Sequence, residues 1–120
     1  MIAAISQRFS PPERDTIVLE TPAEREAWLN LRGWQVGSPQ ESMTKVPQQW
    51  LTLPGQRWLN IQNLQGLHPE DYAGCDALRL TYPVTGTGQT ALKAELLLCG
   101  NTLIGAQVYS AETGIIQSVI

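Results

Sequence analysis

The last third of the chain carries the feature that most restricts its fold, because three turn signals there separate four runs of alternating apolar and polar residues. The runs cover 77–83, 91–98, 103–109 and 115–119. Alternation with a period of two sends successive side chains to opposite faces of a strand. Short glycine-containing connections between such runs are typical of hairpins. The pattern therefore predicts an antiparallel meander of about four strands.

The first hairpin has a register in which both faces are chemically consistent. A loop at 86–88 places Leu80 opposite Ala94 on an apolar face. The other face then sets Arg79 opposite Glu95, and a cross-strand pair of opposite charge stabilises a sheet. Because a slip of one residue would exchange the two faces, we expect this register.

In the second hairpin the periodicity competes with the turn dipeptide. A two-residue loop at 100–101 would put Ile104 on the charged face. A three-residue loop at 100–102 instead sets Leu96 opposite Ala106 on the apolar face. We expect the wider loop, since burial of one face specifies register more strongly than a loop dipeptide.

A helix over 22–32 is indicated by signals at both of its ends. Thr21 can cap the helix and Pro22 suits its first turn, while Gly33 is a typical stop. Ala23, Ala27, Trp28 and Leu31 recur at helical spacing. A β-branched run at 16–20 leads into this helix as a strand. The helix is amphipathic, and we expect it to cover the apolar face of the meander.

The middle of the chain has weaker signals. We expect residues 34–49 to be mostly loop, with a short strand at 34–36. Two short strands at 50–53 and 57–61 are predicted around the turn Pro54-Gly55-Gln56. One helical turn is expected at 68–73, where a proline opens the segment and Gly74 follows it.

Length and charge bound the class of protein. A chain of 120 residues suits one hydrophobic core, so we predict a single α+β domain over 16–120, preceded by a flexible N-terminal arm at 1–15. A net charge of −3 offers no cationic field to a phosphate backbone, which argues against nucleic acid. No apolar run is long enough for a spanning helix. We therefore expect a soluble, cytoplasmic protein that uses no cofactor.

Trp50, Arg57 and Trp58 form the candidate binding surface. Strand alternation over this segment puts both tryptophans on one face and the leucine and isoleucine side chains on the other. If the aliphatic face is the core, both indole rings point outward. Aromatic residues and arginine are enriched in the cores of protein interfaces. The alternative is that one or both rings pack beneath the 34–49 loop.

The two cysteines, Cys75 and Cys99, fall opposite each other in the register of the first hairpin. This placement is compatible with a disulfide. The competing interpretation is a pair of free, partly buried thiols in a reducing compartment, and it is the one that we expect.

A catalytic interpretation would use Cys75 as nucleophile, His68 as base and Asp71 or Asp76 to orient the base. No sequence signature surrounds Cys75, and nothing in the spacing fixes the geometry of these groups. The short paired spacings of a structural zinc site are absent as well, so no metal is expected.

The function that the sequence favours is therefore binding. We expect a non-enzymatic, protein-binding accessory module that acts on a partner protein or on a second copy of itself. Its contact surface would be the low-charge surface that bears Trp50 and Trp58, or an open sheet edge such as the terminal strand at 115–119. The alternative, in another class, is a small-ligand-binding protein or a cysteine-dependent enzyme that uses Cys75 and His68.

Overall fold

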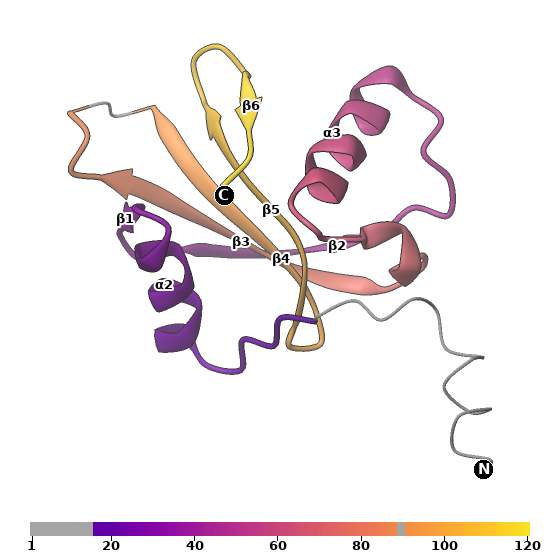
Figure 1. Cartoon of the computed structure of the whole chain (residues 1–120), viewed down its shortest axis with the longest axis horizontal. Helices are drawn as coiled ribbons and strands as arrows, with labels where there is room; N and C mark the ends of the chain where they lie inside the picture. The colour runs from indigo at the N-terminus through magenta and orange to yellow at the C-terminus, as the bar shows by residue number, and fades with distance from the viewer. Residues whose placement is uncertain (1–15, 89–90) are drawn as a thin grey trace.

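An antiparallel sheet of six strands organises the residues that the computed structural model describes, 16–88 and 91–120 (Figure 1). The strands are β1 (Gln35–Val36), β2 (Gln40–Lys45), β3 (Asp76–Thr85), β4 (Leu92–Cys99), β5 (Thr102–Ser110) and β6 (Ile116–Gln117). The helices are α2 (Pro22–Leu31) and α3 (Leu53–Leu64), with a 3-10 turn, η1 (Pro69–Tyr72). The predicted α+β class is confirmed, with more strands than expected, while the arm predicted at 1–15 lies outside the described residues.

Helix α2 forms where its end signals predicted it. The Thr21 hydroxyl accepts a hydrogen bond from the backbone N–H of Glu24, and the Glu24 carboxylate accepts one from the backbone N–H of Thr21. This reciprocal capping satisfies N–H groups that the first turn leaves without helical partners. Trp28 and Leu29 are buried against the sheet, so the amphipathic face does cover the meander.

The first hairpin keeps the predicted faces but shifts the predicted register by two residues. Leu80 pairs with Leu96 rather than with Ala94, and Arg79 lies opposite Leu97. A shift of two preserves which side chains share a face. The cause is a connection longer than 86–88, since β3 ends at Thr85 and β4 begins only at Leu92.

The second hairpin keeps the predicted pairing along β4, but the predicted three-residue loop at 100–102 is wrong because a β-bulge intervenes. Leu96 pairs with Ala106 as predicted. The register then shifts between Leu97 and Leu98, so that Cys99 pairs with Thr102 around a two-residue loop. The bulge adds one residue to β5 and sends Ile104 to the second face of the sheet.

Two predictions for the middle of the chain are wrong. Residues 40–45, expected as loop, form strand β2 along β3. Residues 53–64, expected as strand and turn, form helix α3, whose first turn is capped by the Thr52 hydroxyl accepting from the Gly55 N–H. Pro54 lies in that first turn, where the backbone N–H that proline lacks would have no hydrogen-bond partner within the helix. The turn at 68–73 is confirmed as η1.

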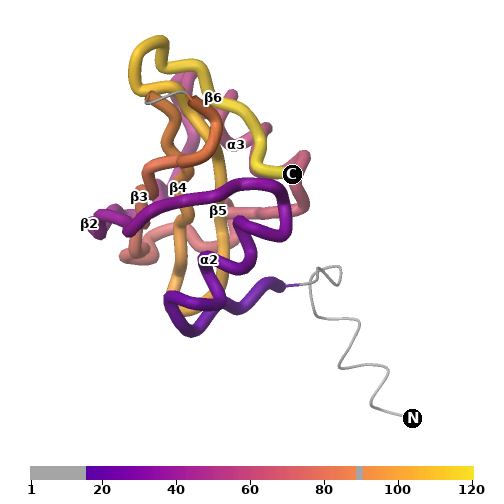
Figure 2. Tube along the Cα trace, turned by 90° about the vertical axis from the view of Figure 1, so that its left-hand side faces the viewer, coloured from indigo at the N-terminus to yellow at the C-terminus, as the bar shows by residue number. Residues whose placement is uncertain are grey.

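The two helices lie on opposite faces of the sheet (Figures 1 and 2). The α2 face holds the main core, in which Leu29, Leu80, Leu96 and Leu98 are almost fully buried. The α3 face holds a smaller cluster around Val46, Ala77 and Ile104. Within the part of the chain described here, no helix is long and apolar enough to cross a membrane.

Three different parts of the chain cover the outer edge of β5. The backbone of residues 17–19 pairs with its start, where the Leu103 N–H donates to the Ile17 carbonyl at 2.8 Å. Strand β6 pairs with its end, at Val108 and Tyr109. Between them, side chains of α3 take the backbone groups of Ala106. The predicted terminal strand at 115–119 shortens to the two residues of β6.

Candidate binding groove

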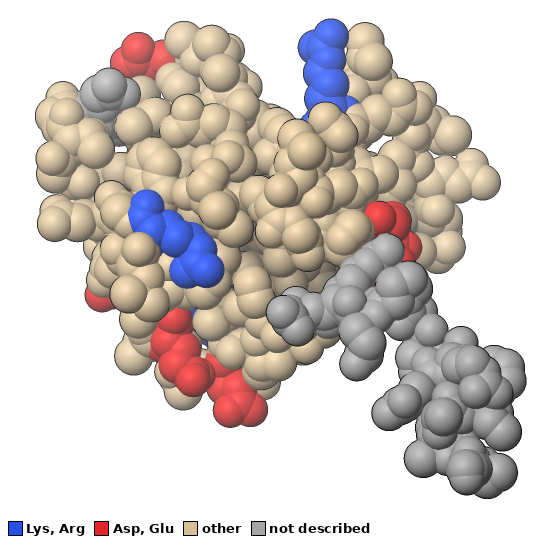
Figure 3. Space-filling view, viewed as in Figure 1, with Lys and Arg blue, Asp and Glu red and all other residues tan. Residues whose placement is uncertain are grey.

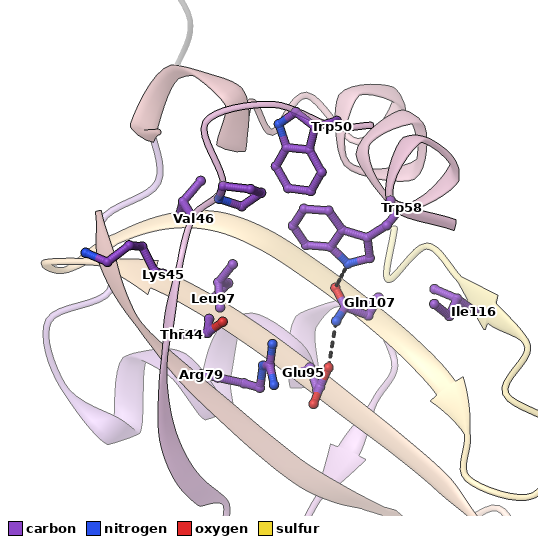
Figure 4. A pocket seen from close by; sticks show the side chains of 12 residues that line it. Thr44, Lys45, Val46, Trp50, Trp58, Arg79, Glu95, Leu97, Gln107 and Ile116 are labelled. Atoms are coloured by element: carbon purple, nitrogen blue, oxygen red, sulfur yellow. Dashed lines mark hydrogen bonds between the residues drawn. The ribbon is translucent and has the colours of Figure 1, made fainter. Parts of the chain in front are cut away.

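A groove of about 370 Å³ lies between α3 and the sheet (Figure 4). Trp50 and Trp58 line its α3 side. Its remaining lining residues come from the end of β2 and the segment after it (Thr44, Lys45, Val46, Pro47), from β3, β4 and β5 (Arg79, Glu95, Leu97, Gln107), and from Gly55 and Ile116. The groove thus draws on five strands and one helix that are far apart in the sequence.

The two predicted tryptophans form the groove's aromatic wall. Their rings are stacked, with centroids 5.2 Å apart and an angle of 19° between the ring planes. Of the two orientations that the sequence left open, the outward one is wrong, because Trp58 lies against Gly105 and Trp50 packs on the cluster around Val46. Leu51 and Leu53 are instead 78% and 60% exposed. Helical periodicity in place of strand alternation reverses which side chains face inward. Trp50 packs against the buried Val46 of the 34–49 segment in the smaller cluster, so the alternative of a ring packed with that segment holds for Trp50.

A chain of hydrogen bonds fixes Trp58 and the floor below it. The Trp58 indole N–H donates to the Gln107 amide oxygen at 2.9 Å. The Gln107 amide nitrogen donates in turn to the Glu95 carboxylate at 2.7 Å, and the Thr81 hydroxyl donates to the other Glu95 oxygen at 2.9 Å. Each link fixes the orientation of the next group, so the network holds the wall and floor in one arrangement.

Glutamines fasten α3 to the sheet. Gln62 is fully buried, and its amide oxygen accepts from the backbone N–H of Ala106 at 2.7 Å while its amide nitrogen donates to Gln107. Gln65 donates to the Ala106 carbonyl at 2.8 Å and accepts from the Val119 N–H. These side chains replace the backbone partners that another strand would offer to β5. Directional hydrogen bonds therefore hold α3, and with it the aromatic wall of the groove, in one position relative to the sheet.

The charged groups of the groove differ in how far they are already paired. Lys45 lies 2.9 Å from the Asp76 carboxylate, and both Glu95 oxygens accept hydrogen bonds. Arg79 is exposed on the floor, and no described residue forms an ion pair or hydrogen bond with its guanidinium. Arg79 is thus the cation best placed to meet an anionic group of a ligand.

The surface around α3, β5 and β6 carries few charged side chains (Figure 3). Arg57, the third predicted binding residue, is exposed on α3 and is not among the residues that line the groove. The groove is also lined by Arg79, Glu95 and Gln107, which the sequence analysis did not identify as binding residues. Only the alternation in β3 and β4 signalled Arg79 and Glu95, as a charged face, and no local pattern marked Gln107.

Cys75 and Cys99 form a disulfide with Cα atoms 6.3 Å apart, which corrects the expectation of free thiols. The bridge joins the segment before β3 to the end of β4, beside Trp50 and Leu97. With its sulfur bonded, Cys75 carries no thiolate that could act as a nucleophile.

His68 lies at the start of η1 and faces Glu70 rather than the disulfide. Its Nδ1 is 3.1 Å from a Glu70 carboxylate oxygen, and Asn63 contacts both side chains. Burial acts to raise the pKa of Glu70, but hydrogen bonds from its own backbone N–H, from His68 and from Asn63 outweigh it and hold that pKa below its ordinary value. Asp71 contributes its backbone N–H to the His68 carbonyl. No hydrogen bond between described residues joins His68 to Cys75.

Among the described residues, no group of histidine, cysteine or acidic side chains is arranged to hold a metal ion. No protein-family model, curated protein or solved structure matches the chain. The groove's own geometry is therefore the basis for a functional proposal.

Proposed function

We propose that the protein is a non-enzymatic binding module whose groove receives a segment of a partner protein. The observation that carries the proposal is the stacked pair of Trp50 and Trp58 over a floor with Arg79, whose guanidinium forms no ion pair or hydrogen bond with any described residue. Aromatic anchors held in place before binding lose little conformational entropy when a partner arrives. The chemistry favours an acidic segment, with an apolar side chain against the tryptophans and a carboxylate at Arg79.

A selection from displayed random peptides tests this function, with the intact protein as target. We expect enriched peptides to carry an aliphatic or aromatic residue close to an aspartate or glutamate. Binding of a synthetic copy, followed by fluorescence anisotropy, should weaken ~tenfold in Arg79→Gln, the loss of one charge-assisted contact. Arg57→Gln is the matched control, because Arg57 is an exposed arginine outside the groove.

Trp50→Ala provides the second variant, since Trp50 is only half buried and its removal leaves the Trp58 hydrogen bond in place. Circular dichroism confirms that each variant is folded. Peptides that bind Arg79→Gln and Trp50→Ala as tightly as they bind the wild-type protein would contradict the groove as the binding site.

Small-ligand binding is the second candidate, and the size of the groove favours it. A volume of about 370 Å³ lies near the lower end of the range of small-molecule sites. A fragment screen by NMR separates the two, because a small-molecule site would give saturable shifts at Trp50 and Trp58 with compounds that lack any peptide character. The cysteine-dependent alternative would require reduction of the Cys75–Cys99 bond before any chemistry at Cys75.

The cytoplasmic location expected from the sequence would go with reduced cysteines. Disulfides persist in oxidising compartments and are rare in the cytoplasm. The bond between Cys75 and Cys99 therefore favours an oxidising compartment over the cytoplasm. Alkylation of the native protein in freshly lysed cells tests this, because unmodified cysteines support the oxidising location and rapid labelling of both supports the cytoplasm.

A further inference from the structure

Strand β2 is the longest strand with an open side in the described part of the chain. It pairs with β3 along Gln40–Lys45, and no described backbone group pairs with its other side. All but one of its residues are exposed, and Met43 is 64% exposed. An open strand edge is a template for pairing with another strand.

The hydrogen-bond pattern identifies the groups that this edge presents. The Val46 N–H donates to the Cys75 carbonyl, in the same register that pairs β2 with β3. Because backbone groups alternate in direction along an antiparallel strand, Glu41, Met43 and Lys45 direct their N–H and C=O groups away from β3. Their side chains share the face of the sheet that carries Leu80.

The strand is complementary to itself in one register. Two identical strands that pair antiparallel about a two-fold axis centred on Met43 set each Glu41 opposite the Lys45 of the other copy. The neighbouring register, centred on Ser42, sets Glu41 opposite Met43 and Lys45 opposite Pro39, which has no N–H to donate. Opposite charges directly across a strand pair stabilise it and like charges destabilise it.

We propose that two copies of the chain associate through antiparallel pairing of their β2 strands, centred on Met43. Each copy offers the same patch to the other, as a two-fold interface requires. The pairing continues the sheet from one copy into the next and places the two Met43 side chains against each other. The interface shares Thr44 and Lys45 with the lining of the groove, but the proposal does not depend on the groove function proposed above.

The dimer is expected to be weak. Pairing of one six-residue strand covers less surface than the ~1,600 Å² of a standard stable interface. Light scattering over a concentration series, from about micromolar to about millimolar, should therefore show the mass rising from 13.2 kDa toward twice that value.

Met43→Pro is the first test of the interface. The Met43 N–H faces solvent in the single copy, and proline is tolerated on an edge strand at such a position. In the pair, the substitution removes the central hydrogen bonds, so we expect dimerisation to weaken ~tenfold or more. Met43→Ala is the matched control, because it trims the side chain but keeps the N–H, and it should weaken dimerisation less than Met43→Pro does.

Charge exchange gives a test that a folding defect cannot imitate. Glu41→Lys leaves two cations on each edge and Lys45→Glu leaves two anions, so each variant alone should dimerise at least ~threefold more weakly than the wild type. An equimolar mixture should regain wild-type association, because every cation then meets an anion across the pair. Both positions are exposed, and circular dichroism verifies folding of each variant.

A wild-type protein that remains at 13.2 kDa at millimolar concentration would overturn the proposal. A dimer that persists unchanged in Met43→Pro, or a mixture of charge variants that fails to associate, would overturn it as well. Trp50→Ala should leave the dimer intact, which separates this interface from the groove.

Discussion

Gly105 of β5 lies directly beneath the indole ring of Trp58. A Cβ atom at Gly105 would stand 3.0 Å from Cζ2 and 3.2 Å from Cη2 of that ring. The backbone of Gly105 is not in the left-handed region, so its lack of a side chain serves the approach of the ring rather than the conformation of the strand. The position of the aromatic wall therefore depends on a glycine in the floor.

Gly105→Ala should displace Trp58 and strain its bond to Gln107. Overpacking of this kind costs about 1–3 kcal/mol of unfolding free energy. Urea denaturation followed by tryptophan fluorescence measures the loss, and the native emission spectrum should shift as well. Gly66→Ala is the control, since Gly66 has a positive φ and open space around it. Gly66→Ala should lower the unfolding free energy without shifting the native tryptophan emission. Identical native emission spectra for Gly105→Ala and Gly66→Ala would contradict the role of Gly105.

Gln62→Leu should lower the unfolding free energy by more than the small difference in volume between the two side chains would. The substitution removes the acceptor of the Ala106 N–H and a donor to Gln107, and leaves the Ala106 group buried and unpaired. A buried unpaired polar group costs about 1–3 kcal/mol. Chemical denaturation checks the value. Asn60→Leu, at an exposed site on the same helix, should change stability by no more than about 0.5 kcal/mol.

Reduction of the Cys75–Cys99 bond should lower the unfolding free energy by about 3 kcal/mol, since the bridge closes a loop with a sequence separation of 24. Urea unfolding with and without a reductant measures the difference. The Cys75→Ala/Cys99→Ala variant should match the reduced protein and should not respond to reductant. A wild-type protein whose unfolding midpoint ignores reductant would contradict the presence of the bond.

Tyr82 should make stability fall at alkaline pH. Burial, assisted by the negative charges of Glu26 and Glu41 and opposed by the positive charge of Arg25, raises its pKa from 10.0 to about 12. Because the folded state binds this proton more tightly, the contribution is complete below about pH 10 and is lost as the pH rises toward 12. Tyr82→Phe, which keeps the ring in the core, should show a smaller decline of unfolding free energy between these pH values. Equal declines in both proteins would count against a buried phenol.

The elements that the sequence predicted correctly are those whose signals are local. The residues that cap α2 are Thr21 and Glu24, at its N-terminal end. They therefore predict the start of the helix without reference to the rest of the fold. The alternation in β3 to β5 assigned the faces of the sheet correctly except at Leu103 and Ile104, which the bulge exchanges. The register of the first hairpin depended on a connection whose length the sequence did not fix.

The errors arose where a local signal has two structural meanings. The pair Pro54-Gly55 suits a turn between strands and also suits the first turn of a helix capped by Thr52. That choice reversed the orientation of Trp50 and Trp58. The buried glutamines left no sequence signal at all, since the hydrogen bonds by which Gln62 ties α3 to Ala106 and Gln107 of β5 join residues more than forty positions apart.

The covering of the β5 edge limits how large an assembly of this chain can become. Residues 17–19, the α3 glutamines and β6 together occupy the backbone groups on that side, whereas β2 leaves the opposite side accessible. A sheet with two accessible sides could add copies without end and grow into a filament. With one side sealed, the proposed association through β2 would use up the only long open strand in the described residues, and growth would stop at two copies.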